Sequence, residues 1–461
     1  MRQKVAIRSD ASPRIGYGHF VRSLSLARML GDSFDCSFWS LEPSDWQRRL
    51  AEDICPLHPL KESEGFDGFL KGLDVDEIVV LDNYYFSEEH QLKVKEKGCK
   101  LVCIDDLHDK HFLADLILAP CSDSPGEWSL EPGCGIAAGP RWALIGPEFT
   151  EVAPEGTRSG AFISFGGSDP LALTLKCARK LRELYPDEEI WAVVGDGFPA
   201  PDALAAVGGI SIRSNVSPAE MAALMRSSRI AVCSASGTCY ETLACGCEVY
   251  AGHYVDNQQD FYGLLTRRGL IHPLGDLRSG EPDFSTPSPA SRIAFGGLAK
   301  RFRSLFRGLS LEAVPYQALS PGQSREVWEE RNRPEIRCRM SNPEPFSYES
   351  HCSFIEGLRH HPDRMYYAFY DGGKLVGTYN FIDIKPGIGA EGGLFVVPSA
   401  QGKGYGAAMA AIMEARISRL GVRELRASVL SDNPASLRFH ESLGYRITRS
   451  DGRYHYLTLA L

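Results

Sequence analysis

Short apolar runs recur along the first 280 residues, and each is followed by a polar or glycine-rich turn and then by a helical pattern. Uninterrupted runs of this length favour parallel strands that are buried on both faces. The first series predicts strands at residues 5–7, 78–81, 101–104 and 116–118. A second series predicts strands at residues 161–165, 190–194 and 230–233. Two such series predict an α/β protein with two doubly wound, Rossmann-like lobes, in which ligands bind at the carboxyl ends of the strands.

The pattern changes after the second series. Residues 273–291 are rich in Pro, Ser and Gly, so we expect a linker or loop there, followed by a helix over 292–307. A different pattern starts near residue 312. We therefore expect a first lobe at residues 1–155, a second lobe at 156–280, a linker with a crossover helix at 281–311 and a further domain at 312–461.

Composition narrows the classes of function. The chain has 461 residues and a net charge of -9, which argues against a broad nucleic-acid-binding surface. We find no apolar run of membrane-spanning length and no signal-peptide pattern, and the 13 cysteines are scattered and odd in number. Cys245 and Cys247 have no partner pair at zinc-ligand spacing, so we expect no metal site. These features favour a cytoplasmic enzyme or assembly protein with reduced thiols.

A glycine-rich turn near the N-terminus carries candidate chemistry. Gly16 and Gly18 follow the first predicted strand, and His19 stands where the next helix begins. Such a turn presents backbone N–H groups to a phosphate, and histidine is suited to move a proton near neutral pH. The turn could also be a dinucleotide fingerprint, but Val21 stands where the third glycine belongs. His19 could also be an ordinary residue at a helix start.

Three further turns follow successive strands of the second series. They are Gly166-Gly167-Ser168-Asp169, Gly195-Asp196-Gly197 and Ser234-Ala235-Ser236-Gly237-Thr238. Hydroxyl and free N–H groups at a helix start can hold phosphate oxygens. Glu241, one turn into the following helix, can accept hydrogen bonds from a ribose diol. The three turns together predict a nucleotide diphosphate site.

These motifs, in this order, resemble one enzyme family. Arg8–Ser12, Ile15–His19 with Arg22, Asp82-Asn83-Tyr84, Gly166–Asp169, Ser236–Thr238 with Glu241, and Asn257-Gln258 are similar to the motifs of the UDP-2,4-diacetamido-2,4,6-trideoxy-β-L-altropyranose hydrolases of pseudaminic acid biosynthesis. The resemblance covers roughly residues 1–280. It implies a two-lobed fold like that of the GT-B glycosyltransferases and a UDP-linked amino sugar as substrate.

The resemblance also implies roles for residues of this chain. His19 would activate the water that attacks the anomeric carbon, and UDP would leave. Asp10 would orient His19, bind a sugar hydroxyl or serve only as a structural turn carboxylate. The implied substrate contacts are Asp10, Gly18, Arg22, Tyr84 and Asn257. The implied UDP contacts are Gly167, Ser168, Asn215, Val216, Ser236, Gly237, Thr238 and Glu241.

A second motif family lies in the last 150 residues. Gln401-Gly402-Lys403-Gly404-Tyr405-Gly406 follows a predicted strand at 394–397 and precedes a helix with apolar residues at core spacing. This loop resembles the acetyl-CoA pyrophosphate loop of GNAT acetyltransferases, and residues 433–445 resemble a second GNAT motif. The implied acetyl-CoA contacts are Val397, Gln401, Gly402, Lys403, Gly404, Tyr405, Gly406, Asn433 and Ser436.

The motif leaves alternatives for the general acid of the acetyl transfer and offers one candidate for the general base. His440 stands where many GNAT enzymes carry the tyrosine that protonates the CoA thiolate. It would be the acid itself, or a surface residue with water as the acid, and Glu391 is the candidate base. Trp328, Arg331, Asn332, Arg337, Met340 and His351 resemble a GNAT subgroup that acetylates the 4-amine of a UDP-4-amino-4,6-dideoxy sugar.

The two resemblances together predict a bifunctional enzyme that uses acetyl-CoA and a UDP-linked amino sugar. The acetyltransferase would supply the substrate of the hydrolase. Three alternatives stay open. The first 280 residues could form a true glycosyltransferase or a nucleotide-sugar-binding module, and the GNAT domain could acetylate another amine.

Overall fold

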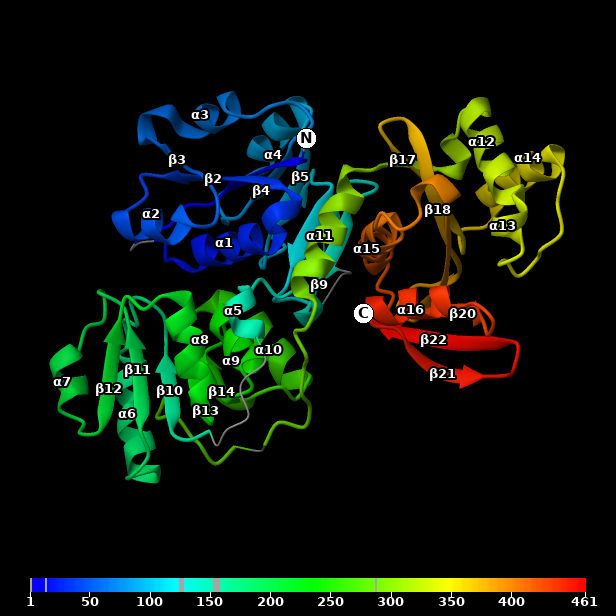
Figure 1. Cartoon of the computed structure of the whole chain (residues 1–461). Coiled ribbons are helices and arrows are strands. Elements are labelled where there is room, and N and C mark those ends of the chain that lie inside the picture. The colour runs from blue at the N-terminus through cyan, green and yellow to red at the C-terminus, as the bar shows by residue number, and fades with distance from the viewer. Residues whose placement is uncertain (1, 13–14, 124–127, 152–157, 287) are drawn as a thin grey trace. The chain divides into compact units, whose positions relative to one another are not determined.

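A computed structural model describes residues 2–12, 15–123, 128–151, 158–286 and 288–461 (Figure 1). The chain divides into two compact units. The first unit comprises residues 1–123 and 138–300, and the second comprises residues 124–137 and 301–461. The boundary at residue 300 falls within helix α11 (Leu298–Ser310).

The N-terminal part of the first unit is built on a parallel sheet. Its strands lie in the order β3-β2-β1-β4-β5-β7, and all adjacent pairs are parallel. The strands are β1 (Lys4–Arg8), β2 (Asp35–Leu41), β3 (Leu57–Leu60), β4 (Ile78–Leu81), β5 (Lys100–Ile104) and β7 (Leu116–Ala119), with the short β6 at His111–Phe112. The connecting helices are α1 (Gly18–Leu30), α2 (Asp45–Glu52), α3 (Gly65–Lys71) and α4 (Glu88–Glu96), and α5 (Pro147–Thr150) follows.

A second parallel sheet forms the rest of the first unit. Its strand order is β12-β11-β10-β13-β14-β15. The strands are β10 (Ala161–Ser164), β11 (Ile190–Val194), β12 (Ile210–Ser214), β13 (Ile230–Ser234), β14 (Glu248–His253) and β15 (His272–Asp276). The helices are α6 (Leu173–Leu184), α7 (Pro201–Ala205), α8 (Pro218–Ser227), α9 (Gly237–Ala244) and α10 (Gln259–Arg267).

All seven strands predicted for this region are present, and their ends shift by at most one residue. Most residues of these seven strands are buried, because helices cover both faces of a parallel sheet. The predicted linker is wrong at its start, since residues 272–276 form β15. This strand contains Pro273 and Gly275 and lies at the edge of its sheet, where proline is tolerated. The helix predicted at 292–307 begins only at Leu298, after Gly297 with φ of 74°.

The second unit has a mostly antiparallel sheet with the strand order β16-β17-β18-β19-β20-β22-β21. These strands are β16 (Glu312–Pro315), β17 (Met365–Asp371), β18 (Lys374–Lys385), β19 (Gly389–Val396), β20 (Glu424–Leu430), β21 (Arg446–Ser450) and β22 (Tyr454–Ala460). The helices after α11 are α12 (Pro321–Asn332), α13 (Pro334–Arg337), α14 (Tyr348–Gly357), α15 (Tyr405–Ser418) and α16 (Pro434–Leu443). Residues 124–137 contribute β8 (Ser129–Leu130) and most of β9 (Gly135–Ala138).

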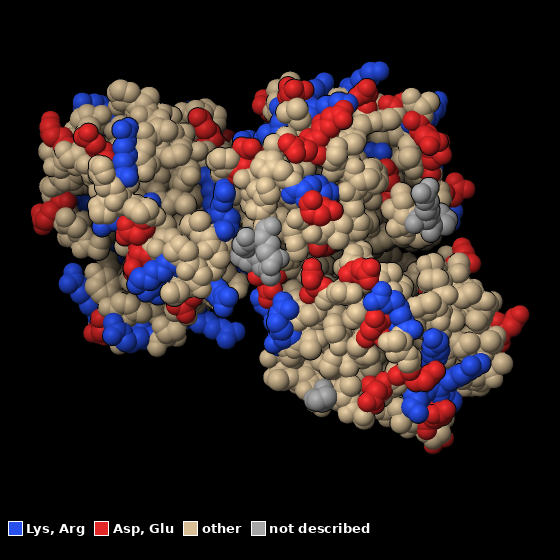
Figure 2. All heavy atoms as spheres, turned by 180° about the vertical axis from the view of Figure 1, so that it is seen from behind, with Lys and Arg blue, Asp and Glu red and all other residues tan. Residues whose placement is uncertain are grey.

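On the face shown in Figure 2, acidic and basic side chains are interspersed. Within the described residues, no helix combines the length and the apolar character needed to cross a membrane.

Candidate active sites

The functional side chains of the first sheet come from turns at the carboxyl ends of three strands. Ser9 to Ser12 and Ile15 to His19 follow β1, Asp82 to Tyr84 follow β4, and Asp105 and Asp106 follow β5. Because β1, β4 and β5 are parallel neighbours, these three turns meet at one edge of the sheet.

His19 and Asp82 form a hydrogen-bonded pair. The His19 Nδ1 atom lies 2.7 Å from Asp82 Oδ1. The carboxylate also accepts hydrogen bonds from Arg22 and from the Ser23 hydroxyl, at 2.8 Å and 2.7 Å on Oδ2. Burial alone would raise the pKa of Asp82, but Arg22 and His19 lower it well below its usual range.

The protonation of the pair follows from this environment. An ionised carboxylate can only accept, so the proton between His19 and Asp82 sits on Nδ1. With Nδ1 turned to Asp82, Nε2 is the ring nitrogen through which His19 can accept a proton. The Tyr84 ring packs edge-on against His19 with ring centroids 4.5 Å apart, which fixes the plane of the imidazole.

A second carboxylate extends the network. Arg22 Nη1 donates to Asp106 Oδ2, and the Tyr84 hydroxyl donates to the same oxygen at 3.3 Å. Asn257 Nδ2, from the second sheet's side of the first unit, donates to the Tyr84 oxygen at 3.4 Å. Burial and the charge of Asp106 raise the pKa of Tyr84 well above its usual range, so the phenol stays neutral. The structure thus brings four predicted residues together around Asp82 and Asp106: His19, Arg22, Tyr84 and Asn257.

One of the options from the sequence was that Asp10 orients His19. In the structure, the Asp10 carboxylate has other partners. It accepts from Arg8, from the Leu41 backbone N–H at 2.6 Å and from the Tyr85 hydroxyl. The residue is 3% exposed. The carboxylate that orients His19 is therefore Asp82, and the contacts of Asp10 are those of a structural carboxylate. Gly18 is exposed at the start of α1.

The pair Asp105-Asp106 at a predicted strand end suggests metal or acid–base chemistry from the sequence alone, but there we favour a structural or sugar-contact role. Asp82 has no predicted role beyond its place in the motif Asp82-Asn83-Tyr84. The available signal was the position of Asp82 directly after the fully buried β4 and of Asp106 two residues after the end of β5.

The turns of the second sheet also meet at the carboxyl ends of parallel strands. A Cβ added at Gly195 would lie 2.2 Å from the Gly167 carbonyl oxygen, so the two turns are in backbone contact. Asp169 is buried and accepts the backbone N–H groups of Leu173 and Thr174, both at 2.8 Å, at the start of α6. Gly167 and Ser168 are left exposed beside it. A Cβ at Gly167 would stand 3.6 Å from the Tyr17 ring, which brings this turn close to the turn that carries His19.

Helix α9 begins with exposed polar groups. Ser236 is its N-cap residue, but its side chain makes no capping hydrogen bond, and no atom lies within 4 Å of a Cβ added at Gly237. Thr238 is half-buried, and Glu241 lies one turn further on. Burial raises the pKa of Glu241 to about 7, with a smaller effect from the charge of Glu148. A ligand that donates hydrogen bonds to this carboxyl group would therefore favour its ionised form.

Asn215 and Val216 follow β12, as predicted. Asn215 is exposed, adopts a left-handed backbone conformation with φ of 53°, and donates from Nδ2 to Asp196 at 3.2 Å. The predicted UDP contacts therefore follow three strands of the parallel sheet, β10, β12 and β13.

In the second unit, two adjacent strands separate. β19 pairs with β20 in parallel only from Gly389 to Glu391, and the rest of β19 has no pairing with β20. Glu391 stands at the point of separation, where its Oε1 accepts from the Ser428 hydroxyl at 2.9 Å. Gly392 and Gly393 follow it, so the backbone at the opening carries no side chains of its own. An extended ligand with amide groups can bind such an unpaired strand edge.

The predicted pyrophosphate loop lies between β19 and α15. Gly402 and Gly404 have φ of 74° and 83°, which explains the glycines there. Gln401 donates from Nε2 to the Val396 carbonyl at 3.1 Å, and the Tyr405 hydroxyl donates to Asp371 at 2.5 Å. The loop backbone thus reaches the N-terminus of a fourteen-residue helix, an arrangement that favours anions.

His440 is buried at 8% exposure, so it is not a surface residue. Its Nδ1 lies 2.8 Å from the Ser436 carbonyl oxygen, which requires a proton on Nδ1. Burial lowers the pKa of His440, so the neutral ring with no proton on Nε2 is favoured. This state suits a general acid poorly. Asn433 caps α16 by accepting from the Ser436 backbone N–H at 3.1 Å.

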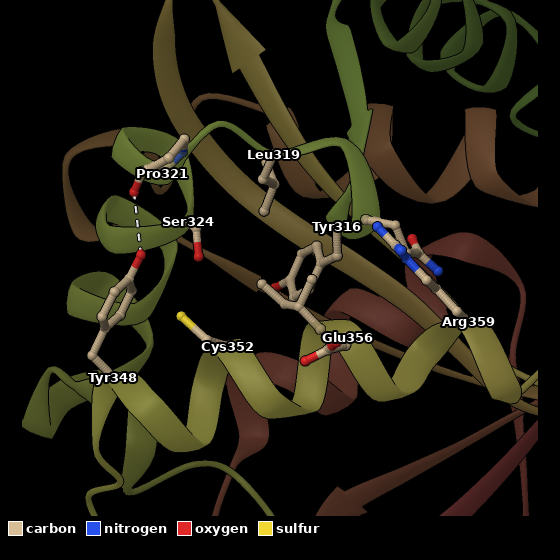
Figure 3. A pocket seen from close by; sticks show the side chains of 10 residues that line it. Tyr316, Leu319, Pro321, Ser324, Tyr348, Cys352, Glu356 and Arg359 are labelled. Carbon is tan, nitrogen blue, oxygen red and sulfur yellow. Dashed lines mark hydrogen bonds between the residues drawn. The ribbon is translucent and has the colours of Figure 1, made fainter.

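A separate hollow of about 310 Å³ lies between the segment before α12 and helix α14 (Figure 3). Tyr316 stands within it, and Cys352, Glu356 and Arg359 project from the α14 side. The Tyr348 hydroxyl donates across one end to the Pro321 carbonyl at 3.3 Å. None of the residues predicted for either site lines this hollow. Across the described parts of the chain, no cluster of three or more His, Cys, Asp or Glu side chains could hold a metal ion.

Part of the second unit matches a known protein family. Residues 326–445 match the model of the acetyltransferase (GNAT) family. The C-terminal region carries a GNAT domain. A relative of this GNAT region is the acetyltransferase PseH of Campylobacter jejuni, 24% identical over 144 residues, which cover 31% of this chain and 90% of the relative.

Other relatives match further parts of the chain. The UDP-2,4-diacetamido-2,4,6-trideoxy-beta-L-altropyranose hydrolase of Campylobacter jejuni is 29% identical over 283 residues, which cover 58% of this chain and 97% of that enzyme. The uncharacterized protein MJ1062 of Methanocaldococcus jannaschii is 23% identical over 485 residues and 97% of both chains. The resemblance predicted from the motifs of both regions is confirmed.

Proposed function

We propose that this protein is a bifunctional enzyme of pseudaminic acid biosynthesis. The GNAT domain transfers the acetyl group of acetyl-CoA to the 4-amine of UDP-4-amino-4,6-dideoxy-N-acetyl-β-L-altrosamine. The N-terminal region then hydrolyses UDP from the diacetamido sugar. The observation that carries the hydrolase half is the free Nε2 of His19, held by the ionised Asp82, within the region related to a UDP-sugar hydrolase.

In the hydrolytic step, His19 Nε2 accepts a proton from water, and the water oxygen attacks the anomeric carbon. The bond between that carbon and the diphosphate oxygen breaks, and UDP leaves with the electron pair. Asp82 holds the tautomer of His19 and stabilises the imidazolium as it forms, the role of the carboxylate in hydrolytic triads. Tyr84 is neutral and shares hydrogen bonds with Asn257 and Asp106, so it is placed to orient the sugar or the water.

UDP would bind across the turns after β10 to β13. The backbone N–H groups of Gly167, Ser168 and the first turn of α9 face the diphosphate, with the hydroxyls of Ser236 and Thr238. Their fixed dipoles stabilise the charge that develops on the leaving diphosphate. Glu241 accepts from the ribose diol, and the backbone of Asn215 and Val216 meets the uracil edge.

In the acetyl transfer, the sugar amine attacks the thioester carbonyl and the CoA thiolate leaves. Glu391, at the point where β19 and β20 separate, takes the proton from the amine. The loop 401–406 binds the pyrophosphate. The half-buried Arg331 suits an acceptor with a diphosphate, because within the described chain no carboxylate forms an ion pair with it. His440 is a weak candidate for the acid, since burial lowers its pKa.

The proposal extends to the architecture. The parallel pairs from β3 to β7 and from β12 to β15 support a GT-B-like pair of lobes at residues 1–155 and 156–280, followed by a linker and helix at 281–311 and the GNAT domain at 312–461. Both substrates are metabolites of the cytoplasm, so we place the enzyme there.

The test supplies the full-length protein with the UDP-4-amino sugar, with and without acetyl-CoA, and measures free thiol and free UDP separately. We expect thiol release and a UDP release that depends on acetyl-CoA. His19→Ala should abolish UDP release and leave thiol release intact. Glu391→Gln should abolish both thiol release and UDP release when the amino sugar and acetyl-CoA are supplied, and UDP release should return when the diacetamido sugar is added.

Other outcomes would favour the alternatives. UDP release that requires a sugar or lipid acceptor would indicate a glycosyltransferase. Tight UDP-sugar binding without turnover, unchanged by His19→Ala, would indicate a binding module. Thiol release with a different amine and none with the UDP-amino sugar would reject the proposed acceptor.

A further inference from the structure

Helix α11 places a cation on the loop 401–406. Arg307 donates from Nη1 to the carbonyl oxygen of Lys403. Its guanidinium carbon lies 4.3 Å from the centre of the Tyr405 ring, a stacking distance. A Cβ added at Gly404 would stand 3.1 Å from Arg307 Nη1. The guanidinium therefore covers the point where the loop enters α15.

The position of Arg307 is fixed by close packing of α11 against α15. Phe302, Leu305 and Phe306 are fully buried on the inner face of α11. At Gly308, a Cβ would lie 2.3 Å from the Ala408 carbonyl oxygen, so only glycine fits where the helices meet (Figure 1). Because Gly308 is next to Arg307 in sequence, this contact holds the arginine at the first turns of α15.

Arg307 has an incomplete set of partners. Among the described residues, no carboxylate lies within ion-pair distance of it, and the nearby Asp371 accepts the Tyr405 hydroxyl. A guanidinium has five N–H donors in a planar fork that matches phosphate oxygens. Here the fork stands beside a helix N-terminus and a glycine loop, both of which also favour anions.

We propose that Arg307 binds the pyrophosphate of acetyl-CoA, so that α11 completes the cofactor site of the GNAT domain. The inference rests on the proposed acetyltransferase function. It adds a residue that lies outside the segment matched by the GNAT family, residues 326–445. The connecting helix is then part of the acetyltransferase and not only a tether.

The test measures binding of CoA to the full-length protein by calorimetry, for the wild type, Arg307→Gln, Arg307→Lys and the control Lys300→Gln. Lys300 is an exposed cation on the same helix. We expect Arg307→Gln to weaken CoA binding about tenfold, Arg307→Lys to weaken it less, and the control to bind as the wild type does. Dephospho-CoA, which keeps the pyrophosphate and lacks the 3′-phosphate, should show the same loss.

Several results would overturn the inference. Unchanged CoA binding in Arg307→Gln would do so, as would equal losses in the Gln and Lys variants, because the arginine would then only shape the loop. A loss confined to CoA and absent with dephospho-CoA would move the contact to the 3′-phosphate. No CoA binding by the wild type would instead reject the proposed acetyltransferase itself.

Discussion

The affinity of the protein for UDP should rise with pH because of Glu241. In the ligand-free protein, burial raises the pKa of this carboxyl group from 4.5 to about 7, so roughly half of the molecules carry a neutral Glu241 at pH 7. A ribose diol that donates two hydrogen bonds favours the charged form. UDP binding should therefore expel a proton from Glu241.

The size of the effect follows from the two pKa values. If the bound ribose returns Glu241 to its ordinary pKa, the affinity for UDP is proportional to the fraction of free protein in which Glu241 is ionised. That fraction is roughly a tenth at pH 6 and roughly nine tenths at pH 8. The UDP affinity should then rise about tenfold over this range, or ~1.4 kcal/mol, with about half a proton released per UDP at pH 7.

Isothermal titration calorimetry in two buffers of different ionisation enthalpy measures both quantities. Glu241→Gln is the matched variant, because it keeps the shape and removes the titration. The terminal phosphate of UDP also titrates in this range, but it does so equally with both proteins, so the difference between them isolates Glu241. A second control is 2′-deoxy-UDP, which lacks one of the two ribose donors and should release fewer protons.

The reasoning fails if the wild type and Glu241→Gln show the same pH dependence and the same proton release. Glu241 would then be buried for structural reasons and would not touch the ribose. The free protein offers an independent check of the pKa. A raised pKa in the folded state means that stability is greatest below pH 4.5 and falls as the pH rises through 7, by up to about 3 kcal/mol.

Three further substitutions test the geometry. Asp82→Asn should lower kcat for UDP release by about 10²–10⁴-fold with UDP affinity unchanged, because His19 loses its fixed tautomer; steady-state kinetics with an intact kcat would contradict this. Gly308→Ala should destabilise the second unit by about 1–3 kcal/mol in thermal unfolding, and an unshifted transition would show that α11 and α15 do not meet there. Gly195→Ala should weaken UDP binding by about tenfold or more by displacing the neighbouring turn, whereas Gly208→Ala, with open space around it, should bind UDP normally.

The sequence predicted the fully apolar strands better than the strands with polar residues, proline or glycine. β4 and β11 match their predicted ends because strands covered on both faces are continuous apolar runs. β2 escaped prediction because its buried and exposed positions alternate, and polar side chains interrupt the apolar run. β15 contains proline and glycine, and it forms because β14 offers a free edge with which to pair. The residues of β15 alone do not predict this pairing.

The same limit applies to the sites. The glycine turns and His19 are local motifs, so the sequence alone locates them. The sequence left the role of Asp10 open between orienting His19, binding a sugar hydroxyl and serving as a structural turn carboxylate, and it did not point to Asp82 as the partner of His19. The partner depends on which way each side chain points, and Asp82 is 63 positions away from His19. The contact of Arg307 with Lys403 spans 96 positions and depends on how α11 packs.

The proposed hydrolysis needs a general base and no general acid, and the charged groups around His19 fit this requirement. A sugar diphosphate leaves without protonation when N–H dipoles stabilise its charge, so only the water must lose a proton. The network around His19 keeps each group in the matching state: Asp82 is ionised, Tyr84 is a neutral donor, and Arg22 binds both carboxylates. Asp82 and Asp106 together with the cation Arg22 leave one net negative charge beside the ring, which favours the imidazolium that forms when His19 accepts the proton. A step that required an acid would need a second titrating group facing His19, and Arg22 and His19 hold Asp82, the carboxylate bonded to it, in its charged form.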